Sequence, residues 1–502
     1  MLKIEPDVDA FPTDRPTVVW ATLVADLETP VSAFLKLAEG RPNAVLLESV
    51  EGGAVRGRYS ILALAPDVIW RCQGAVAAIN RHALTAPDAF EPCAEPPLEA
   101  LRALIAESAI ELPPGLPPMA AGIFGYLGYD MVRLMEKLAP AKPDPIGVPD
   151  AILVRPTIVV VFDAVRDEIT VVTPVRPAPG GTPRQAYDRA VDRLTEIVER
   201  LDAPLDKTTP AADPGALTAE LTSNTTPAEY HAMVAKAKEY ILAGDIFQVV
   251  LAQRFEAPFT LPPFALYRAL RRVNPAPFLV YLSFDDFSLV CSSPEILVRL
   301  REGKVTIRPI AGTRPRGSTP AEDHALEAEL LADPKELSEH LMLLDLGRND
   351  VGRVSAIGTV TVTDKFFIER YSHVMHIVSN VEGTLDSKQD ALDALIAGFP
   401  AGTVSGAPKV RAMQIIDELE KDKRGPYAGA IGYFGAGGDM DSCIVLRTSV
   451  VKDGRMYVQA GAGIVHDSVP ASEQAECVNK AKAQFRAADE ARRFAASVGR
   501  GQ

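Results

Sequence analysis

The sequence has 502 residues, of which 47% are hydrophobic, and it carries a formal net charge of −14 with a pI of about 5.1. This length and composition indicate a globular protein with room for two or three lobes. The negative charge disfavours nucleic acids and anionic membrane surfaces as partners, so an acidic small molecule would need a local cluster of arginine, lysine or metal to hold it.

The five cysteines are scattered and include no Cys-x-x-Cys pair, which argues against a disulfide framework and a structural zinc site. The N-terminus lacks a basic segment followed by an apolar run. No apolar stretch reaches the roughly 20 residues of a membrane span. We therefore expect a soluble, cytoplasmic protein that is not exported.

Residues 1–202 alternate short β-rich runs, helical stretches and proline-dense loops. Strands are expected at Ala44–Glu48, Arg58–Leu64, Gly122–Gly128, Thr157–Phe162 and Glu168–Thr173. Helices are expected at Val31–Ala38 and Arg184–Leu201. The Pro-, Asp- and Thr-rich stretch that follows predicts a linker over residues 203–225.

Residues 226–490 form the second large part. Thr226-Pro-Ala-Glu229 is a capping box that predicts a helix through Ala243. Strands and helices then alternate as far as a long terminal helix, from about Ser472 to Ser497. Because antiparallel-looking strands alternate with single helices in both parts, we predict an α+β fold.

The segment from Phe399 to Glu420 places a small-residue loop directly before an amphipathic helix. Pro408 suits the first helical turn, and Lys409 and Arg411 add positive charge. Four small residues leave backbone N–H groups uncovered: Gly402, Ser405, Gly406 and Ala407. The pattern is typical of a carboxylate-binding site, but an ordinary loop before a proline-initiated helix explains it equally well.

One helix is expected to begin at Asp333 as N-cap with Pro334 at N1, and it carries Glu336 and Glu339. Its apolar stripe is expected at Leu337, Leu341 and Leu344. Glu336 at N3 has a structural explanation, because an acid there completes a capping box. Glu339 has no such explanation.

The terminal helix carries a second pair of acids, Glu473 and Glu476, with Lys480 one turn later. A solvated helix face would explain these residues as well. Mg²⁺ takes a few carboxylates and keeps positions for water and substrate oxygens, so one glutamate from each helix would make a site that the substrate completes.

Tyr371–His376 places two histidines among β-formers, where a single buried histidine is more often a core residue than a catalyst. Further on, Arg424–Tyr433 and Ser442–Thr448 predict neighbouring strands, and Gln459–Ile464 predicts a small-residue turn with exposed N–H groups.

Ordered motifs give a resemblance to a known family. They are Gly244–Leu251, Cys291–Glu295, Pro309–Gly317, Asp345–Arg353 and Phe399–Glu420. With them the chain resembles the chorismate-utilising enzymes, and within that family the large subunits of anthranilate synthase. The resemblance is strong over residues 220–490 and looser over residues 18–165. It implies repeated α-β-β units in a four-layer α/β/β/α core with two packed, largely antiparallel sheets.

The resemblance also implies roles for single residues. Glu339 and Glu476 would bind Mg²⁺, with Glu473 nearby. Glu336 would be the general acid. The catalytic histidine would be His376, rather than His373 or His340. Tyr427 and Arg447 would hold the enolpyruvyl carboxylate of chorismate. The remaining substrate-binding residues would be Gly312, Thr313, Thr403, Gly461, Ala462, Gly463 and Lys480.

Two positions address the reaction. Family members that activate water carry a lysine where this chain has Gln248, and aminodeoxychorismate synthases commonly carry a lysine where it has Ala311. Neither residue present here can serve as base or nucleophile. The resemblance therefore implies that ammonia attacks chorismate to give anthranilate and pyruvate, the first committed step of tryptophan biosynthesis. Component I of an aminodeoxychorismate synthase, and a catalytically silent chorismate or tryptophan sensor, are the alternatives.

No cysteine lies in a Gly-x-Cys-x-Gly nucleophile turn, so a separate glutamine amidotransferase subunit is implied, and we expect a hetero-oligomer. Leu46–Ser49 with Arg58, and Asn274–Leu279, resemble the tryptophan feedback pocket of anthranilate synthases. Its residues here would be Glu48, Ser49, Arg58, Pro277, Phe278 and Leu279. The last two replace the family's usual Tyr and Met, which makes inhibitor affinity harder to predict than the existence of a pocket.

Overall fold

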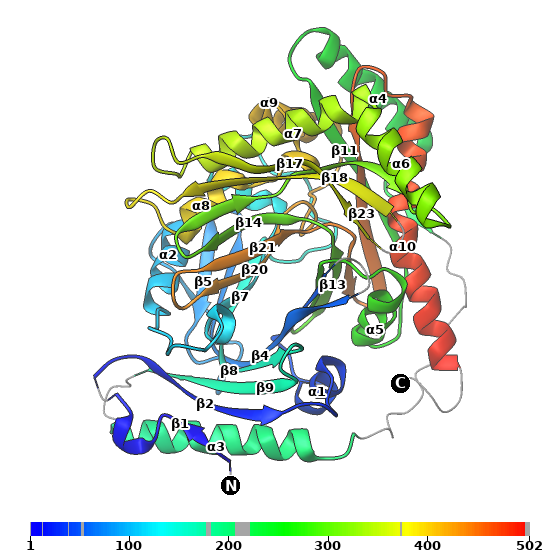
Figure 1. Cartoon of the computed structure of the whole chain (residues 1–502). Coiled ribbons are helices and arrows are strands. Elements are labelled where there is room, and N and C mark those ends of the chain that lie inside the picture. Colours follow the sequence, from blue (N-terminus) through cyan, green and yellow to red (C-terminus); the bar gives the residue numbers. More distant parts are fainter. Residues whose placement is uncertain are drawn as a thin grey trace.

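A computed structural model describes residues 2–12, 14–38, 40–51, 55–176, 182–205, 221–371 and 374–496 (Figure 1). His373, most of the predicted linker and Ser497 lie outside these residues. Within them, no helix is long and apolar enough to cross a membrane.

Two long strands join the sheets of the molecule. β4 (Val55–Gln73) and β8 (Ala151–Asp163) are antiparallel neighbours, with Tyr59 opposite Asp163 and Cys72 opposite Ala151. The first sheet continues from β4 in the order β3 (Ala44–Glu51), β12 (Phe278–Ser283), β13 (Phe287–Ser293), β22 (Thr448–Lys452), β23 (Arg455–Ile464) and β11 (Gln248–Pro258).

The second sheet continues from β8. Its order is β7 (Gly122–Leu127), β20 (Ala430–Gly435), β21 (Met440–Ile444), β14 (Ile296–Arg301), β15 (Lys304–Ile307) and β18 (Val374–Thr384). β18 also pairs with β16 (Ile310–Pro315) and β17 (Thr361–Arg370). Every one of these pairs is antiparallel.

Shorter strands extend the edges of both sheets. They are β1 (Ile4–Glu5), β2 (Thr17–Val24), β5 (Val76–Asn80), β6 (Glu91–Pro92), β9 (Glu168–Val175), β10 (Thr222–Ser223) and β19 (Gly406–Ala407). Single 3₁₀ turns occur at Val8–Ala10, Pro118–Ala120, Tyr129–Leu134 and Gly402–Val404.

Helices cover the outer faces of both sheets (Figure 1). The first sheet is covered by α4 (Pro227–Leu242), α5 (Pro263–Val273), α9 (Lys409–Leu419) and α10 (Pro470–Ala496). The second is covered by α6 (Pro320–Ala332), α7 (Pro334–Gly352) and α8 (Ala391–Gly398). α2 (Pro97–Glu107) lies on β5, while α1 (Pro30–Leu37) and α3 (Pro183–Asp202) pack together near β2 and β9. This arrangement confirms the predicted α+β fold.

Apolar side chains from the two sheets meet in a core between them. Leu289 and Cys291 of the first sheet belong to the same buried cluster as Ile431 and Cys443 of the second. Strands from both sides of residues 203–225 pair directly, as in β3 with β12 and β7 with β20. The division of the chain at that segment stays a prediction, and both sheets draw strands from either side of it.

Local capping signals are confirmed. Thr226 Oγ1 accepts from Glu229 N, and Glu229 Oε2 accepts from Thr226 N at 2.8 Å, which starts α4 as predicted. Asp333 caps α7 by accepting from the backbone N–H groups of Lys335 and Glu336. These contacts lie within four residues of one another, so the local sequence suffices to form them.

Three local predictions are wrong. Leu341 is 45% exposed, because the buried stripe of α7 instead runs through His340, Leu343, Leu344, Gly347 and Val351. Pro408 is the N-cap of α9 and not its first helical residue. Gln459–Ile464 is no turn, because it pairs along its length with β11.

The predicted strand over Ser442–Thr448 is also interrupted. β21 ends at Ile444 and β22 begins at Thr448, so Arg447 lies in the break between two sheets. Its φ of 47° is in the left-handed region, which a non-glycine residue rarely adopts. The chain changes sheets here, and the side chain of Arg447 is thereby directed into a cavity.

Candidate active site

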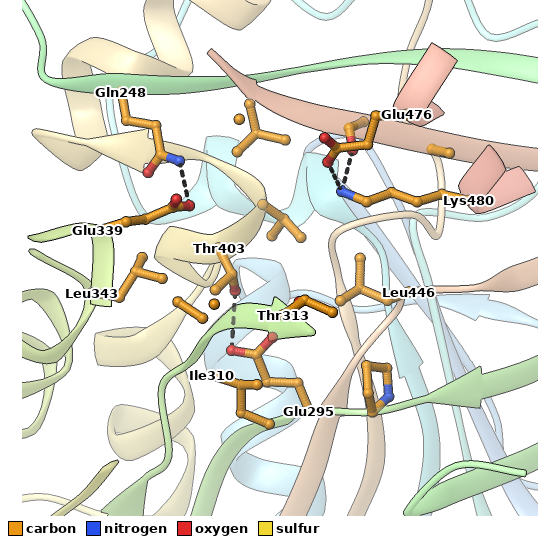
Figure 2. A pocket seen from close by; sticks show the side chains of 18 of the residues that line it. Gln248, Glu295, Ile310, Thr313, Glu339, Leu343, Thr403, Leu446, Glu476 and Lys480 are labelled. Carbon is orange, nitrogen blue, oxygen red and sulfur yellow. Dashed lines mark hydrogen bonds and ion pairs between the residues drawn. The ribbon is translucent and has the colours of Figure 1, made fainter. Parts of the chain in front are cut away.

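A cavity of about 560 Å³ lies where the far ends of the two sheets face each other, and Figure 2 shows side chains from its walls. β11 and β23 form one wall, β16 and β18 the opposite one, and α7 and α10 contribute acidic side chains. The predicted residues that line it are Gly312, Thr313, Glu336, Glu339, His376, Thr403, Tyr427, Arg447, Gly461, Gly463, Glu473, Glu476 and Lys480.

Two predicted elements contribute less than expected. Ala462 is buried but is absent from the cavity wall, which its neighbours Gly461 and Gly463 line. Of the loop before α9, Thr403 and Val404 line the cavity. Lys409 and Arg411 do not, because they form ion pairs with Asp350 and Asp245 at 2.8 and 2.7 Å. Those two cations therefore hold the loop and helix in place.

Glutamates from two helices make one end of the cavity acidic. Glu339 accepts from Gln248 Nε2 at 3.2 Å, and Glu476 pairs with Lys480 at 2.7 Å (Figure 2). Burial raises the pKa of Glu339, and the neighbouring charge of Glu336 raises it further. Burial also raises the pKa of Glu473. This end of the cavity is thus short of positive charge.

The acidic end of the cavity offers carboxylates as possible metal ligands. Among residues 2–12, 14–38, 40–51, 55–176, 182–205, 221–371 and 374–496, no group of three or more His, Cys, Asp or Glu side chains is arranged to hold one. Figure 2 places Glu339 and Glu476 on opposite sides of the view. Burial and neighbouring carboxylates raise the pKa values of Glu339 and Glu473. With Glu476 they give an all-carboxylate donor set, which fits a hard divalent cation whose other ligands come from substrate and water.

Arg447 and Tyr427 mark another wall. Within the part of the chain that the structure describes, the Arg447 guanidinium forms no hydrogen bond or ion pair. Burial lowers the pKa of Arg447, because desolvation disfavours its charge. Tyr427 is buried and lines the same cavity, and a Cβ at Gly461 would lie 2.9 Å from Tyr427 Oη. The pair is suited to bind a carboxylate.

His376 on β18 is held by the neighbouring strand β16. Its Nδ1 lies 3.1 Å from the carbonyl oxygen of Gly312 and 3.0 Å from Thr313 Oγ1. Donation to the carbonyl assigns the proton to Nδ1 and leaves Nε2 as an acceptor. Burial lowers the pKa of His376, so the ring is neutral near pH 7. Gly312 adopts a φ of 74° at a bulge in β16, and this conformation aims its carbonyl at the ring.

His340, the competing candidate, has a structural role. It is fully buried, its Nε2 lies 2.7 Å from Ser379 Oγ, and burial lowers its pKa to about 4. The bond ties α7 to β18 one residue after Glu339. His340 does not line the cavity.

Glu295 was missed as a functional residue. It follows the buried strand β13, is 7% exposed, and lines the cavity. Its Oε1 accepts from Thr403 Oγ1 at 3.3 Å (Figure 2). Burial raises the pKa of Glu295 to about 8, so the group is a neutral acid at pH 7. A single acid between two runs of strand-forming residues, Phe287–Ser293 and Ile296–Arg301, is a signal that could have singled it out.

The predicted inhibitor segments are neighbours across a β-ladder. Ser49 lies opposite Phe278, and Glu48 opposite Leu279, in the β3–β12 pair. Glu48 is already bound, since it accepts from Tyr267 Oη at 2.6 Å and from Arg271 Nε at 2.9 Å.

The other two predicted inhibitor residues lie apart from this ladder. Arg58 is turned to Asp163, with which it pairs at 2.9 Å. Pro277 lines a second cavity, which adjoins the first.

Comparisons place the chain among known proteins. The family model for chorismate binding enzymes matches residues 54–486. Anthranilate synthase component 1 of Cereibacter sphaeroides is 59% identical over 487 residues, which cover 96% of this chain and 97% of that one. The protein with the same description from Thermus thermophilus is 47% identical over 468 residues, covering 93% and 97%.

Solved structures agree with these matches. Anthranilate synthase component I from Streptococcus pneumoniae has a TM-score of 0.77 at 38% identity, with 92% of this chain and 99% of that chain covered. The menaquinone-specific isochorismate synthase MenF of Escherichia coli has a TM-score of 0.71 at 19% identity, covering 95% and 96%, and it shares the fold.

The raised pKa of Glu295 predicts a pH-dependent stability. A carboxyl with a pKa of about 8 in the folded protein and an ordinary pKa of 4.5 stabilises the fold fully below about pH 4.5, and this contribution is lost as pH rises through 8. Relative to Glu295→Gln, the parent should therefore lose free energy of unfolding between these two pH values. Urea unfolding of both proteins at pH 5.5 and 8.5 measures the difference. An equal difference at both pH values would show that Glu295 is charged in the fold.

Proposed function

Because the chain belongs to the family of chorismate-binding enzymes, we propose that it converts chorismate and ammonia to anthranilate and pyruvate, as the large component of an anthranilate synthase. The observation that carries the proposal is a cavity with a partly buried Arg447 on one wall, unpaired among the residues that the structure describes, and a set of glutamates at its acidic end. Chorismate is a dicarboxylate, so each of its carboxylates has a partner of suitable charge when a cation occupies the acidic end.

The enolpyruvyl carboxylate is bound by Arg447 and Tyr427. The ring carboxylate lies toward the backbone of Gly461 and Gly463, where a side chain would have no room: a Cβ at Gly463 would be 2.4 Å from Gln248 Nε2. Gly312, Thr313, Thr403 and Lys480 complete the wall. Mg²⁺, held by Glu339 and Glu476 with Glu473 nearby, would supply Lewis-acid polarisation and orientation of the substrate.

Both positions that distinguish the reactions line the cavity, and neither carries a base. Gln248 binds Glu339 through its Nε2, and Ala311 has no functional group. A water molecule would need such a base, whereas neutral ammonia is already a nucleophile. The absence of lysine at position 311 also disfavours aminodeoxychorismate synthesis.

Glu295 is the better proton donor for the departing C4 hydroxyl. It is buried and neutral at pH 7, whereas Glu336 is half-buried with Oε1 3.5 Å from Arg314. Ammonia adds at ring C2 as the hydroxyl leaves, and loss of the C2 proton and of pyruvate then gives the aromatic ring. His376, with its Nε2 free to accept or relay a proton, assists that elimination.

A separate glutamine amidotransferase subunit would supply ammonia, since the relatives are described as component 1 of an anthranilate synthase. All five cysteines are free thiols, consistent with the cytoplasm as the location. The β3–β12 ladder is where we expect tryptophan to bind as feedback inhibitor.

The purified chain should form anthranilate, detected by fluorescence, and pyruvate from chorismate, Mg²⁺ and ammonium. Glu339→Gln and Glu476→Gln should each lower kcat by more than about 100-fold, because each removes a charged ligand. Glu239→Gln, which removes an exposed carboxylate paired with Lys236, serves as control. Turnover that survives EDTA, or glutamine-driven turnover by the chain alone, would contradict the proposal.

His376→Met should separate the two half-reactions. Acid–base assistance is worth about 10²–10⁴-fold, and the elimination is the step that needs it at this wall. We expect chorismate to be consumed with release of aminodeoxyisochorismate, so that substrate loss exceeds the rise in anthranilate and pyruvate. If both steps slow in equal proportion, His376 binds substrate or holds the wall and has no separate role in elimination.

Tryptophan should bind and raise the apparent KM for chorismate. Ser49→Phe should weaken that binding, because the site is tight: a Cβ at Gly57 would lie 2.0 Å from Ser49 Oγ. Calorimetry with tryptophan alone, together with chorismate kinetics at several tryptophan concentrations, measures both effects. Absence of tryptophan binding to the parent would refute the assignment of this ladder.

A further inference from the structure

A second cavity, of about 630 Å³, adjoins the active site. Both cavities are lined by His376, Arg447, Glu476 and Lys480. The outer wall of the second is the turn over residues 274–277, between α5 and β12. This turn leads directly into Phe278 and Leu279 of the β3–β12 ladder, so one short segment borders both the predicted inhibitor site and the approach to Arg447.

A short chain of hydrogen bonds connects that turn with Arg447. Ser292 Oγ donates to the carbonyl oxygen of Asn274 at 2.5 Å, and Asn274 Nδ2 lies 3.4 Å from Ser292 Oγ. The backbone N–H of Ser292 donates to the carbonyl oxygen of Arg447 at 3.2 Å. Ser292 is fully buried on β13, and Asn274 is half-buried, so water has limited access to these bonds.

Arg447 is sensitive to such a contact. Its left-handed φ of 47° persists only where the surroundings fix it. Its carbonyl is held from two sides, by Ser292 N and by Nε2 of the buried Gln484 on α10. The guanidinium, by contrast, is without an ion pair among the described residues, so the backbone sets where it points.

We propose that Ser292 is a positioning residue that transmits the state of the Asn274–Leu279 segment to Arg447. A ligand on the β3–β12 ladder shifts the turn at Asn274, and the hydrogen bond from Ser292 Oγ to Asn274 shifts Ser292 with it. The bond from Ser292 N to the Arg447 carbonyl then moves Arg447 out of the backbone position in which it binds a carboxylate. The inference rests on the proposed function and identifies how feedback reaches its active site. It requires inhibition to act on chorismate affinity, because the affected group is a binding residue.

Ser292→Ala tests the link, since it removes the hydroxyl and keeps the N–H that holds Arg447. The coupling is the ratio of chorismate KM at saturating tryptophan to KM without it. One net hydrogen bond corresponds to about a 3- to 10-fold change, so the ratio should fall by that factor. Tryptophan Kd, measured by calorimetry without chorismate, should stay at the parent value.

Ser288→Ala is the matched control. Ser288 lies on the same strand and is buried, but its Oγ is 3.3 Å from Tyr281 Oη, and it contacts neither Asn274 nor the two cavities. It should keep the parent ratio. The inference is overturned if Ser292→Ala keeps the parent ratio, or if Ser288→Ala lowers it equally.

Thermal unfolding checks that both variants fold. If Ser292→Ala does not fold, Asn274→Ala removes the amide on the other side of the contact. The KM ratio of Asn274→Ala should fall, and an unchanged ratio overturns the inference.

Failure of the proposed function gives different results. A parent that makes no anthranilate, or that does not bind tryptophan, refutes that proposal, whereas an inhibited parent with an unaltered Ser292→Ala ratio refutes only the link.

Discussion

The antiparallel pairing of β4 with β8 is the constraint on which the rest of the structure depends. Both sheets begin at this pair: the first continues from β4 through β3, and the second continues from β8 through β7. The two sheets are therefore held face to face around a shared apolar core, and their far ends are brought opposite each other. The active-site cavity lies between those far ends, so its walls are positioned by long-range strand pairing and not by a loop.

The cavity is lined by charged and acidic side chains whose desolvation is not fully compensated within the protein. Arg447 is a partly buried cation with no carboxylate partner among the described residues, Glu295 is a neutral acid at pH 7, and Glu339 and Glu473 have pKa values raised by burial. Each of these states costs folding free energy, because desolvation of polar and charged groups is only partly offset. A dianionic substrate and a divalent cation would satisfy them together. Such prearranged groups stabilise developing charge without having to reorganise during the reaction.

Close backbone approach explains why glycine and small residues recur around the cavity. β11 and β23 pair beside Gly461 and Gly463, and added Cβ atoms there would meet Tyr427 and Gln248. Gln248, at the start of β11, donates to Glu339, and Thr403, in the loop before β19, donates to Glu295. Contacts between residues distant in sequence therefore fix the side chains of the cavity wall.

Much of this protein could be predicted where the physical cause is local. The capping box of α4 and the N-cap of α7 depend on residues four apart or fewer. The motifs identified the family, and nearly all the catalytic, substrate-binding and metal-binding residues predicted from them line the cavity. The buried face of α7 was misplaced by one helical position, since Leu341 and His340 differ in exposure only because β18 packs on one side.

What the sequence determined by itself is thus the set of local elements and the chemical inventory of the site. Tertiary structure alone decided how those groups behave. Burial between the sheets makes Glu295 a neutral acid, pairing with β11 turns Gln459–Ile464 into a strand, and Asp350 and Asp245 withdraw Lys409 and Arg411 from the cavity. Each outcome depends on a partner distant in sequence, because desolvation, ladder pairing and ion pairing act through space.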